Sequence, residues 1–172
     1  NSPFGSGVTG ASTGVLFNNR MAYWHLETGH PNILTTGKRV RHTMNAPIII
    51  RDGKVWAVFG TPGADNQVQV NFQIAVALMD HELDPQQAVE AIRWTSSQPN
   101  QGANWPHDGD YSLIIENGLS ASCISNLRQL GHEVKIVPPL EGPCSVACIR
   151  LLNNNTLMAG SDPRRDGWAG AF

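Results

Sequence analysis

The stretch from Ala46 to Phe59, "APIIIRDGKVWAVF", restricts the fold more than any other part of the sequence. Two largely apolar runs, Ala46–Ile50 and Lys54–Phe59, flank Asp52-Gly53, a dipeptide typical of two-residue hairpin turns, in which the backbone takes positive φ. The sequence therefore predicts two antiparallel strands of a sheet. Because the first run is almost wholly apolar, it indicates a strand that is covered on both faces.

Helical patterns follow this hairpin. In "NQVQVNFQIAVALMDHEL" apolar residues recur at the spacing of a helix that buries one face; that face consists of Val68, Phe72, Ala75, Val76 and Met79. Asp84 and Pro85 predict the N-cap and first residue of a second helix. Gly131 predicts the end of a third, "SASCISNLRQLGHEV".

Further strands are expected in "GVLFN", "DYSLIIE", "VKIVP", "SVACIRLL" and "TLMAGSD". The order is strands, two helices, a strand, a helix and then strands. Such an order predicts an α+β fold in which helices cover a mainly antiparallel sheet. A length of 172 residues suits a single domain or part of one.

The composition excludes several classes of function. Charged residues make up 15% of the chain, whereas about 25% is usual for a soluble domain; we therefore expect part of the surface to lie against another chain. The net charge of −2 without a basic block gives no reason to expect nucleic acid or an anionic membrane surface as partner. No apolar run approaches the roughly 18 residues of a membrane span.

The three cysteines, Cys123, Cys144 and Cys148, are interpreted as buried, inert thiols. Their odd number does not suggest a disulfide framework. The C-x3-C spacing of the last two has no companion His or Cys pair, so we expect no zinc site. Neither a metal nor an organic cofactor is expected.

A basic segment, "RVRHTMNAP", precedes the hairpin. Strand alternation would place Arg39 and Arg41 on one face and Val40 with His42 on the other. Two arginines beside His42 and Thr43 offer donors for a carboxylate. The pattern alone fits a solvated basic strand end equally well.

Four stretches carry a family resemblance, in this order: "FGSGVTGASTGVLFNNRM", "GKRVRHTMNAPIIIRDGK", "FGTPGADNQVQVNFQIAVALMDHELDPQQAVEAIRW" and "GSDPRRDGWAGAF". Together they resemble the small subunit of the gamma-glutamyltransferase family, which consists of N-terminal-nucleophile hydrolases. The resemblance implies a four-layer αββα sandwich to which this chain supplies part of the two sheets and some helices. It also implies a precursor that cuts itself into a large and a small subunit, and it allows a dimer of such heterodimers.

The resemblance places residues 1–172 in the small, C-terminal subunit, without the start that would carry the catalytic threonine. Asn1 falls on an asparagine of the substrate site. In the turn "GTPGA", Gly63 and Ala64 correspond to the residues whose backbone N–H groups stabilise the oxyanion of the tetrahedral intermediate. Without the resemblance, this segment reads only as a structural turn. The compartment stays unassigned, with the cytoplasm favoured over the periplasm.

Three departures from the family pattern concern the substrate. Ala22 and Tyr23 stand where gamma-glutamyl transferases carry two aspartates that hold an ammonium group. His42 and Thr43 replace the paired serines that hold the carboxylate, and Arg20 adds a cation. These departures imply a small amide that bears a carboxylate but no ammonium group, as in the oxamate amidohydrolase and acylase branches of the family.

Three alternatives stay open at this point. The chain could belong to a gamma-glutamyltransferase or glutathione hydrolase that binds the ammonium group with other residues. It could belong to a cephalosporin acylase-like enzyme. It could also be a non-catalytic binding subunit.

Overall fold

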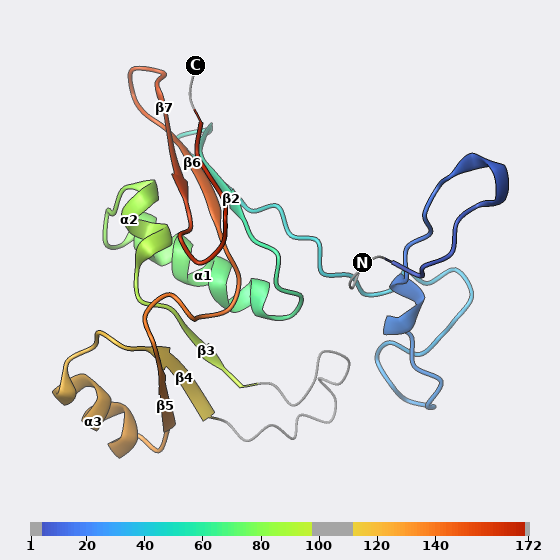
Figure 1. Cartoon of the computed structure of the whole chain (residues 1–172), viewed down its shortest axis with the longest axis horizontal. Helices are drawn as coiled ribbons and strands as arrows, with labels where there is room; N and C mark the ends of the chain where they lie inside the picture. The colour runs from blue at the N-terminus through green and yellow to red at the C-terminus, as the bar shows by residue number, and fades with distance from the viewer. Residues whose placement is uncertain (1–4, 98–111, 171–172) are drawn as a thin grey trace. The chain divides into compact units, whose positions relative to one another are not determined.

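The computed structural model of the protein describes residues 5–97 and 112–170 (Figure 1). The chain divides into two compact units, Asn1–Thr43 and Met44–Phe172, and each is described by itself. Within the described residues, no helix is both long enough and apolar enough to cross a membrane.

The first unit consists mainly of turns, with two short 3-10 helices, Ala11–Thr13 and Arg20–Tyr23. The strand predicted in "GVLFN" is wrong, because this segment forms only an isolated bridge between Thr9 and Leu16. The intervening residues Ala11 and Gly14 have positive φ values of 39° and 68°. They turn the chain back on itself before a regular strand can form.

The second unit contains a four-stranded antiparallel sheet in the order β1-β2-β6-β7. Its strands are β1 (Ile48–Arg51), β2 (Lys54–Gly60), β6 (Ala147–Leu151) and β7 (Leu157–Ser161). The predicted hairpin is confirmed, since Asp52 and Gly53 join β1 to β2 with φ values of 51° and 73°. Positive φ at both central positions matches the twist of the flanking strands.

The expectation that the first strand is covered on both faces is wrong for the described chain. β1 lies at the edge of the sheet and pairs only with β2. As a result, Ile48 is 57% exposed and Ile50 is 66% exposed. An apolar edge strand of this kind is normally covered by another element or chain.

Two helices cover one face of this sheet (Figure 1). Helix α1 (Asn66–Met79) contacts β2, and helix α2 (Pro85–Glu90) contacts β6 and β7. The predicted start of α2 is confirmed. The Asp84 carboxylate accepts the Gln87 N–H at 2.8 Å, and the Gln87 side-chain oxygen accepts the Asp84 N–H at 3.1 Å. This reciprocal capping satisfies two N–H groups that a helix start leaves open.

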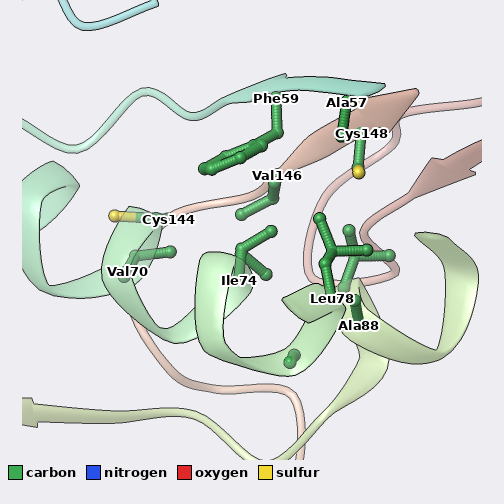
Figure 2. Packing of buried hydrophobic residues seen from close by; sticks show 11 residues of the cluster. Ala57, Phe59, Val70, Ile74, Leu78, Ala88, Cys144, Val146 and Cys148 are labelled. Carbon is green, nitrogen blue, oxygen red and sulfur yellow. The ribbon is translucent and has the colours of Figure 1, made fainter. Parts of the chain in front are cut away.

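Helix α1 buries the opposite face from the one predicted. Its buried apolar residues include Val70, Ile74 and Leu78, which Figure 2 shows packed with residues of β2 and β6. Val68 and Phe72 are 68% and 62% exposed. The prediction failed because α1 carries apolar residues on both faces, and periodicity alone cannot tell which face this chain covers.

A second, three-stranded sheet has the order β3-β4-β5. Its strands are β3 (Trp94–Ser96), β4 (Ser112–Glu116) and β5 (Glu133–Val137), and helix α3 (Ala121–Gln129) connects β4 to β5. Because β4 and β5 are parallel, a helical crossover is the expected connection. The Ser120 hydroxyl caps α3, and Gly131, with φ of 95°, follows its end as predicted.

The cysteines largely match their interpretation as buried thiols. Cys144 and Cys148 belong to the core between α1 and the four-stranded sheet (Figure 2). Burial raises the pKa of the Cys148 thiol to about 11 and also raises the pKa of Cys144. Both thiols therefore stay protonated and unreactive near neutral pH. Cys123, on α3, is only half-buried and departs from the expectation.

We expect residues 1–172, expressed by themselves, to aggregate or to form a loosely packed state. The reason is the apolar surface on α1 and β1, where Val68, Phe72, Ile48 and Ile50 are each more than half exposed. Thermal unfolding and sedimentation of the purified fragment would check this expectation. A monomer with a sharp, cooperative melt would contradict it.

Candidate functional site

Gly63 and Ala64, which we call the oxyanion turn, lie between β2 and helix α1. Both have positive φ, 139° for Gly63 and 49° for Ala64. Their carbonyl groups accept the first backbone N–H groups of α1, from Asn66 at 3.0 Å and from Gln67 at 3.3 Å. Within the described residues, neither the Gly63 N–H nor the Ala64 N–H donates to an acceptor.

Two neighbouring N–H groups of this kind can donate to an oxygen that gains negative charge during a reaction. Because they lie at the positive, N-terminal end of the 14-residue helix α1, the helix dipole adds to the stabilisation of an anion. The donor role of Gly63 and Ala64 stays a prediction; the structure shows that both residues lie just before α1. It also shows that Ala64 tolerates its Cβ in a left-handed conformation.

The two polar residues after the turn have different environments. Asp65 makes no capping hydrogen bond from its side chain to the start of α1. The Asn66 side-chain oxygen accepts the Thr95 hydroxyl at 3.0 Å, which ties the start of α1 to β3. The start of α1 therefore has no side-chain cap.

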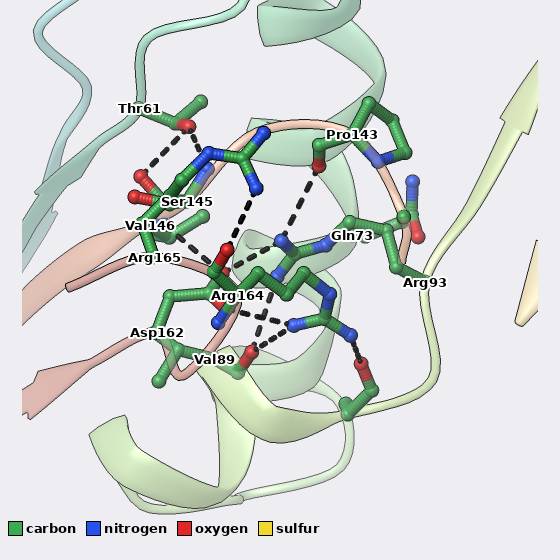
Figure 3. Close-up of polar contacts among 12 residues, drawn as sticks. Thr61, Gln73, Val89, Arg93, Pro143, Ser145, Val146, Asp162, Arg164 and Arg165 are labelled. Atoms are coloured by element: carbon green, nitrogen blue, oxygen red, sulfur yellow. Dashed lines mark hydrogen bonds and ion pairs between the residues drawn. The ribbon is translucent and has the colours of Figure 1, made fainter. Parts of the chain in front are cut away.

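Four buried charged residues, Arg93, Glu116, Asp162 and Arg164, form what we call the buried ion network. Figure 3 shows three of them, Arg93, Asp162 and Arg164. Arg93 donates to Asp162 at 2.6 Å, and Arg164 donates to the other oxygen of Asp162 at 3.0 Å. Arg164 also binds both oxygens of Glu116. Sequence reasoning missed this network, because its members are far apart in the chain and only the "DPRR" segment stood out as a motif.

Hydrogen bonds keep the two carboxyl groups of this network, those of Glu116 and Asp162, ionised. Burial would raise the pKa of Glu116, but hydrogen bonds from Arg164 and from the backbone N–H groups of Arg93 and Gly142 lower it below its ordinary value. Burial opposes ionisation of Asp162 in the same way, and the N–H groups of Val146 and Arg164, together with the Arg93 side chain, lower its pKa. Both acids are therefore charged near neutral pH.

The network holds the segment of residues 142–146, which we call the supporting loop. Glu116 accepts the Gly142 N–H at 2.7 Å, and Asp162 accepts the Val146 N–H at 3.0 Å. The supporting loop also contacts the chain just before the oxyanion turn: the Thr61 hydroxyl accepts the Ser145 N–H at 3.0 Å (Figure 3). Buried charges are thus connected to the turn through one short loop.

In the first unit, four residues gather into what we call the cationic cluster: Arg20, Tyr23, Arg41 and Thr43. The guanidinium carbons of Arg20 and Arg41 lie 5.6 Å and 5.2 Å from the centre of the Tyr23 ring. Arg20 also donates to the Thr43 hydroxyl at 3.0 Å. Within the described residues Arg20 makes no ion pair. An aromatic face stabilises nearby cations, so the cluster keeps two positive groups close together.

The alternation predicted for the basic segment is wrong, because residues 38–47 form no strand. Arg41 and Thr43 are half-buried, whereas Arg39 and His42 are exposed. Arg39 and Arg41 therefore do not share a face. The structure joins Arg41 to Arg20 and Tyr23, while His42 lies on the exposed side of the chain. Ala22 is exposed, and Asn1 lies outside the described residues.

The described residues contain no group of three His, Cys, Asp or Glu side chains that could hold a metal ion. The oxyanion turn offers backbone N–H donors, and the cationic cluster offers two guanidinium groups. The oxyanion turn can stabilise an oxyanion, and the cationic cluster can bind a carboxylate through charge-assisted hydrogen bonds.

Comparison with known proteins gives a consistent result. The gamma-glutamyltranspeptidase family model matches residues 1–172. The chain is 33% identical over 169 residues to a glutathione hydrolase-like YwrD proenzyme of Bacillus subtilis (strain 168), covering 96% of this chain and 31% of that protein. It is 32% identical over 171 residues to an oxamate amidohydrolase proenzyme of Klebsiella pneumoniae, covering 98% of this chain and 31% of that protein.

Among solved structures, gamma-glutamyltranspeptidase from Pseudomonas nitroreducens, complexed with L-DON, matches with a TM-score of 0.74 and 26% identity. The match covers 100% of this chain and 89% of that one. It agrees with the α+β class predicted from the sequence, since this chain has two sheets with helices. The chain spans about a third of the length of the curated relatives it matches, 31% in both cases.

Proposed function

Because this chain belongs to the gamma-glutamyltranspeptidase family, we propose that it is part of an N-terminal-nucleophile amidohydrolase that cleaves a small amide bearing a carboxylate group. An oxamate-like molecule is the substrate class that we favour. The family is one of enzymes, and the names of its matched relatives describe them as proenzymes. The choice of substrate depends on the cationic cluster.

The observation that carries this choice is the approach of Arg20 and Arg41 to a single Tyr23 ring. Each guanidinium can grip a carboxylate through two parallel hydrogen bonds, and such charge-assisted bonds are about twice as strong as neutral ones. The same two cations would repel an ammonium group. Ala22, which stands where an acid would bind that ammonium group, offers no compensating charge.

The oxyanion turn is proposed to stabilise the negative charge that develops during the reaction. In the proposed reaction a threonine hydroxyl attacks the amide carbon, its proton passes to the leaving amine, and an acyl-enzyme ester forms. The carbonyl oxygen becomes negative as the tetrahedral intermediate forms, and the N–H groups of Gly63 and Ala64 stabilise it. Water then hydrolyses the ester. We propose that the threonine lies outside these 172 residues, because no residue here matches its place in the family pattern.

The partner that we propose for this chain is the remainder of the same precursor. Support comes from the apolar surface that the described residues leave open on α1 and β1. On α1 this surface continues into a groove of about 220 Å³, lined in part by Phe72, Val76 and Trp94. Apolar surface of this kind is normally buried in an obligate interface.

A glutathione hydrolase is the second candidate function. It is favoured by the 33% identity to a glutathione hydrolase-like proenzyme. Such an enzyme would have to hold the ammonium group of a gamma-glutamyl substrate with residues other than Ala22 and Tyr23. Preference for a gamma-glutamyl amide over an amide with only a carboxylate would identify it.

We expect Arg20→Ala in the complete enzyme to raise KM for a carboxylate-bearing amide by at least about tenfold, because a charge-assisted bond worth about 1.5–3 kcal/mol is lost. Cleavage of a neutral analogue should change little. Steady-state kinetics with oxamate and with an uncharged amide of similar size would measure both effects.

Arg39→Ala is the matched control, since Arg39 is an exposed arginine of the same unit outside the cationic cluster. It should leave KM for both amides near the wild-type value. Equal effects of the two substitutions, or an equal effect of Arg20→Ala on both amides, would contradict the proposed carboxylate contact.

A further inference from the structure

We propose that Cys144 is a positioning residue, which holds the oxyanion turn in its active conformation through direct packing against Gly63. This inference rests on the proposed function of the turn, and it concerns a side chain that neither binds substrate nor reacts. Cys144 lies in the supporting loop and is 7% exposed. Figure 2 shows it beside Val70, near the start of α1.

The Cys144 side chain lies against the position where Gly63 has no side chain. A Cβ atom added to Gly63 would lie 2.1 Å from the Cys144 sulfur, a distance at which two atoms overlap. The thiol therefore occupies the place where a side chain at position 63 would begin. The sulfur therefore limits how far the Gly63 peptide can move toward the supporting loop.

The backbone of Gly63 needs such an outside restraint. Its φ of 139° is accessible to glycine but is strained for any other residue. Glycine itself prefers no single conformation, so its own stereochemistry does not fix the direction of its N–H group. A donor contributes to catalysis only when it is already oriented before the charge develops. The neighbouring sulfur supplies this restraint.

Cys144 is itself held in an uncommon conformation. Its φ is 76°, which is rare and strained for a residue with a side chain. Strain of this kind persists only where the surroundings impose it. Here the Thr61 hydroxyl lies 2.8 Å from the Pro62 carbonyl oxygen and 2.9 Å from the Ser145 carbonyl oxygen, and it accepts the Ser145 N–H at 3.0 Å. These contacts join the chain just before the turn to Ser145, the residue that follows Cys144.

The buried ion network fixes the other end of the same loop. The Gly142 and Val146 N–H groups bind Glu116 and Asp162, so the loop is anchored one residue before Pro143 and two residues after Cys144. A loop that is anchored at both sides can transmit the rigidity of the core to the turn. Cys144 is the residue of this loop that meets Gly63.

Cys148 provides a matched control. It belongs to the same core cluster and is 0% exposed, but it lies on β6, where it pairs with Phe59 and Gly160 rather than with the turn. Replacement of either cysteine by alanine removes one buried sulfur. The two variants therefore share the loss of packing and differ in the contact with Gly63.

The experiment compares Cys144→Ala, Cys144→Ser and Cys148→Ala in the full-length, processed protein, with the amide that the wild type cleaves best. We expect Cys144→Ala to lower kcat by about tenfold, less than the 10²–10³ lost when a donor is removed, with KM changed less than twofold. Cys144→Ser, which keeps an atom at the sulfur position, should restore most of kcat. Cys148→Ala should lower the melting temperature but keep kcat.

Hydrogen exchange gives a readout that does not depend on turnover. Peptides that contain Gly63 and Ala64 should exchange faster in Cys144→Ala than in the wild type, and not in Cys148→Ala. Unchanged exchange in Cys144→Ala, or equal losses of kcat in the two alanine variants, would overturn the positioning role. If the wild type cleaves no amide, the proposed function is contradicted. Hydrogen exchange would still decide whether Cys144 holds the turn.

Discussion

Replacement of Ala64 by proline is expected to lower the turnover number of the complete enzyme by roughly 10² or more, with a modest change in substrate binding. Proline has no N–H group, so one of the two donors of the oxyanion turn is lost. The effect falls on kcat because this donor binds the oxyanion, which exists only during the reaction. Single-turnover and steady-state rates would separate the chemical step from binding.

Proline cannot adopt the φ of 49° seen at Ala64, so the substitution also changes the backbone. Ala64→Gly is the matched control, because glycine keeps the N–H group and accepts positive φ. It should retain turnover close to that of the wild type. The melting temperature of each variant must show that it is folded. Near-normal turnover of a folded Ala64→Pro protein would end the assignment of Ala64 as a donor.

The largest expected effect on stability comes from Asp162→Ala. Asp162 is 1% exposed and accepts hydrogen bonds from Arg93, from Arg164 and from the Val146 N–H. Its removal leaves a buried guanidinium group without its partner, which typically costs about 3–5 kcal/mol. We expect the free energy of unfolding of the complete protein, measured in denaturant, to fall by this amount.

Glu133→Ala is the control for this prediction. Glu133 and Lys135 form an ion pair with a separation of 3.5 Å, but both side chains are about half exposed. Removing an exposed pair of this kind costs at most about 1 kcal/mol. If Asp162→Ala were no more destabilising than Glu133→Ala, the buried ion network would not be a source of stability.

Local signals in the sequence predicted local structure well. The Asp52-Gly53 hairpin and the capped start of α2 at Asp84 are both confirmed. In each case a few adjacent residues determine the outcome, since the φ values of a turn or the hydrogen bonds of a cap involve only neighbours. The same is true of Gly131 after α3.

Features that depend on distant parts of the chain could not be predicted. Helix α1 carries apolar residues on both faces, and only the position of the sheet decides that Val70 and Ile74 are buried while Phe72 is exposed. The buried ion network brings together residues as far apart as Arg93 and Asp162. No local pattern encodes such a pairing.

In the candidate site, too, local features could be predicted from the sequence and contacts between distant residues could not. Gly63 and Ala64 stand out in the sequence because a turn must follow β2, and the resemblance to a known family gave that turn a role. The placement of Arg41 on one face with Arg39 was wrong, because strand alternation was assumed where the chain forms no strand. The contact between Cys144 and Gly63 is visible only in three dimensions.

The most direct test of the account is the substrate preference of the complete enzyme. The measurement is kcat/KM for three amides of similar size: one with a carboxylate only, such as oxamate, one with both a carboxylate and an ammonium group, such as a gamma-glutamyl anilide, and one with neither. Because Arg20 and Arg41 converge on Tyr23 and Ala22 offers no acid, we expect the highest kcat/KM for the amide with only a carboxylate. The highest value for the gamma-glutamyl compound would contradict it and favour a glutathione hydrolase, and the highest value for the neutral amide would contradict it in favour of an acylase with an apolar pocket.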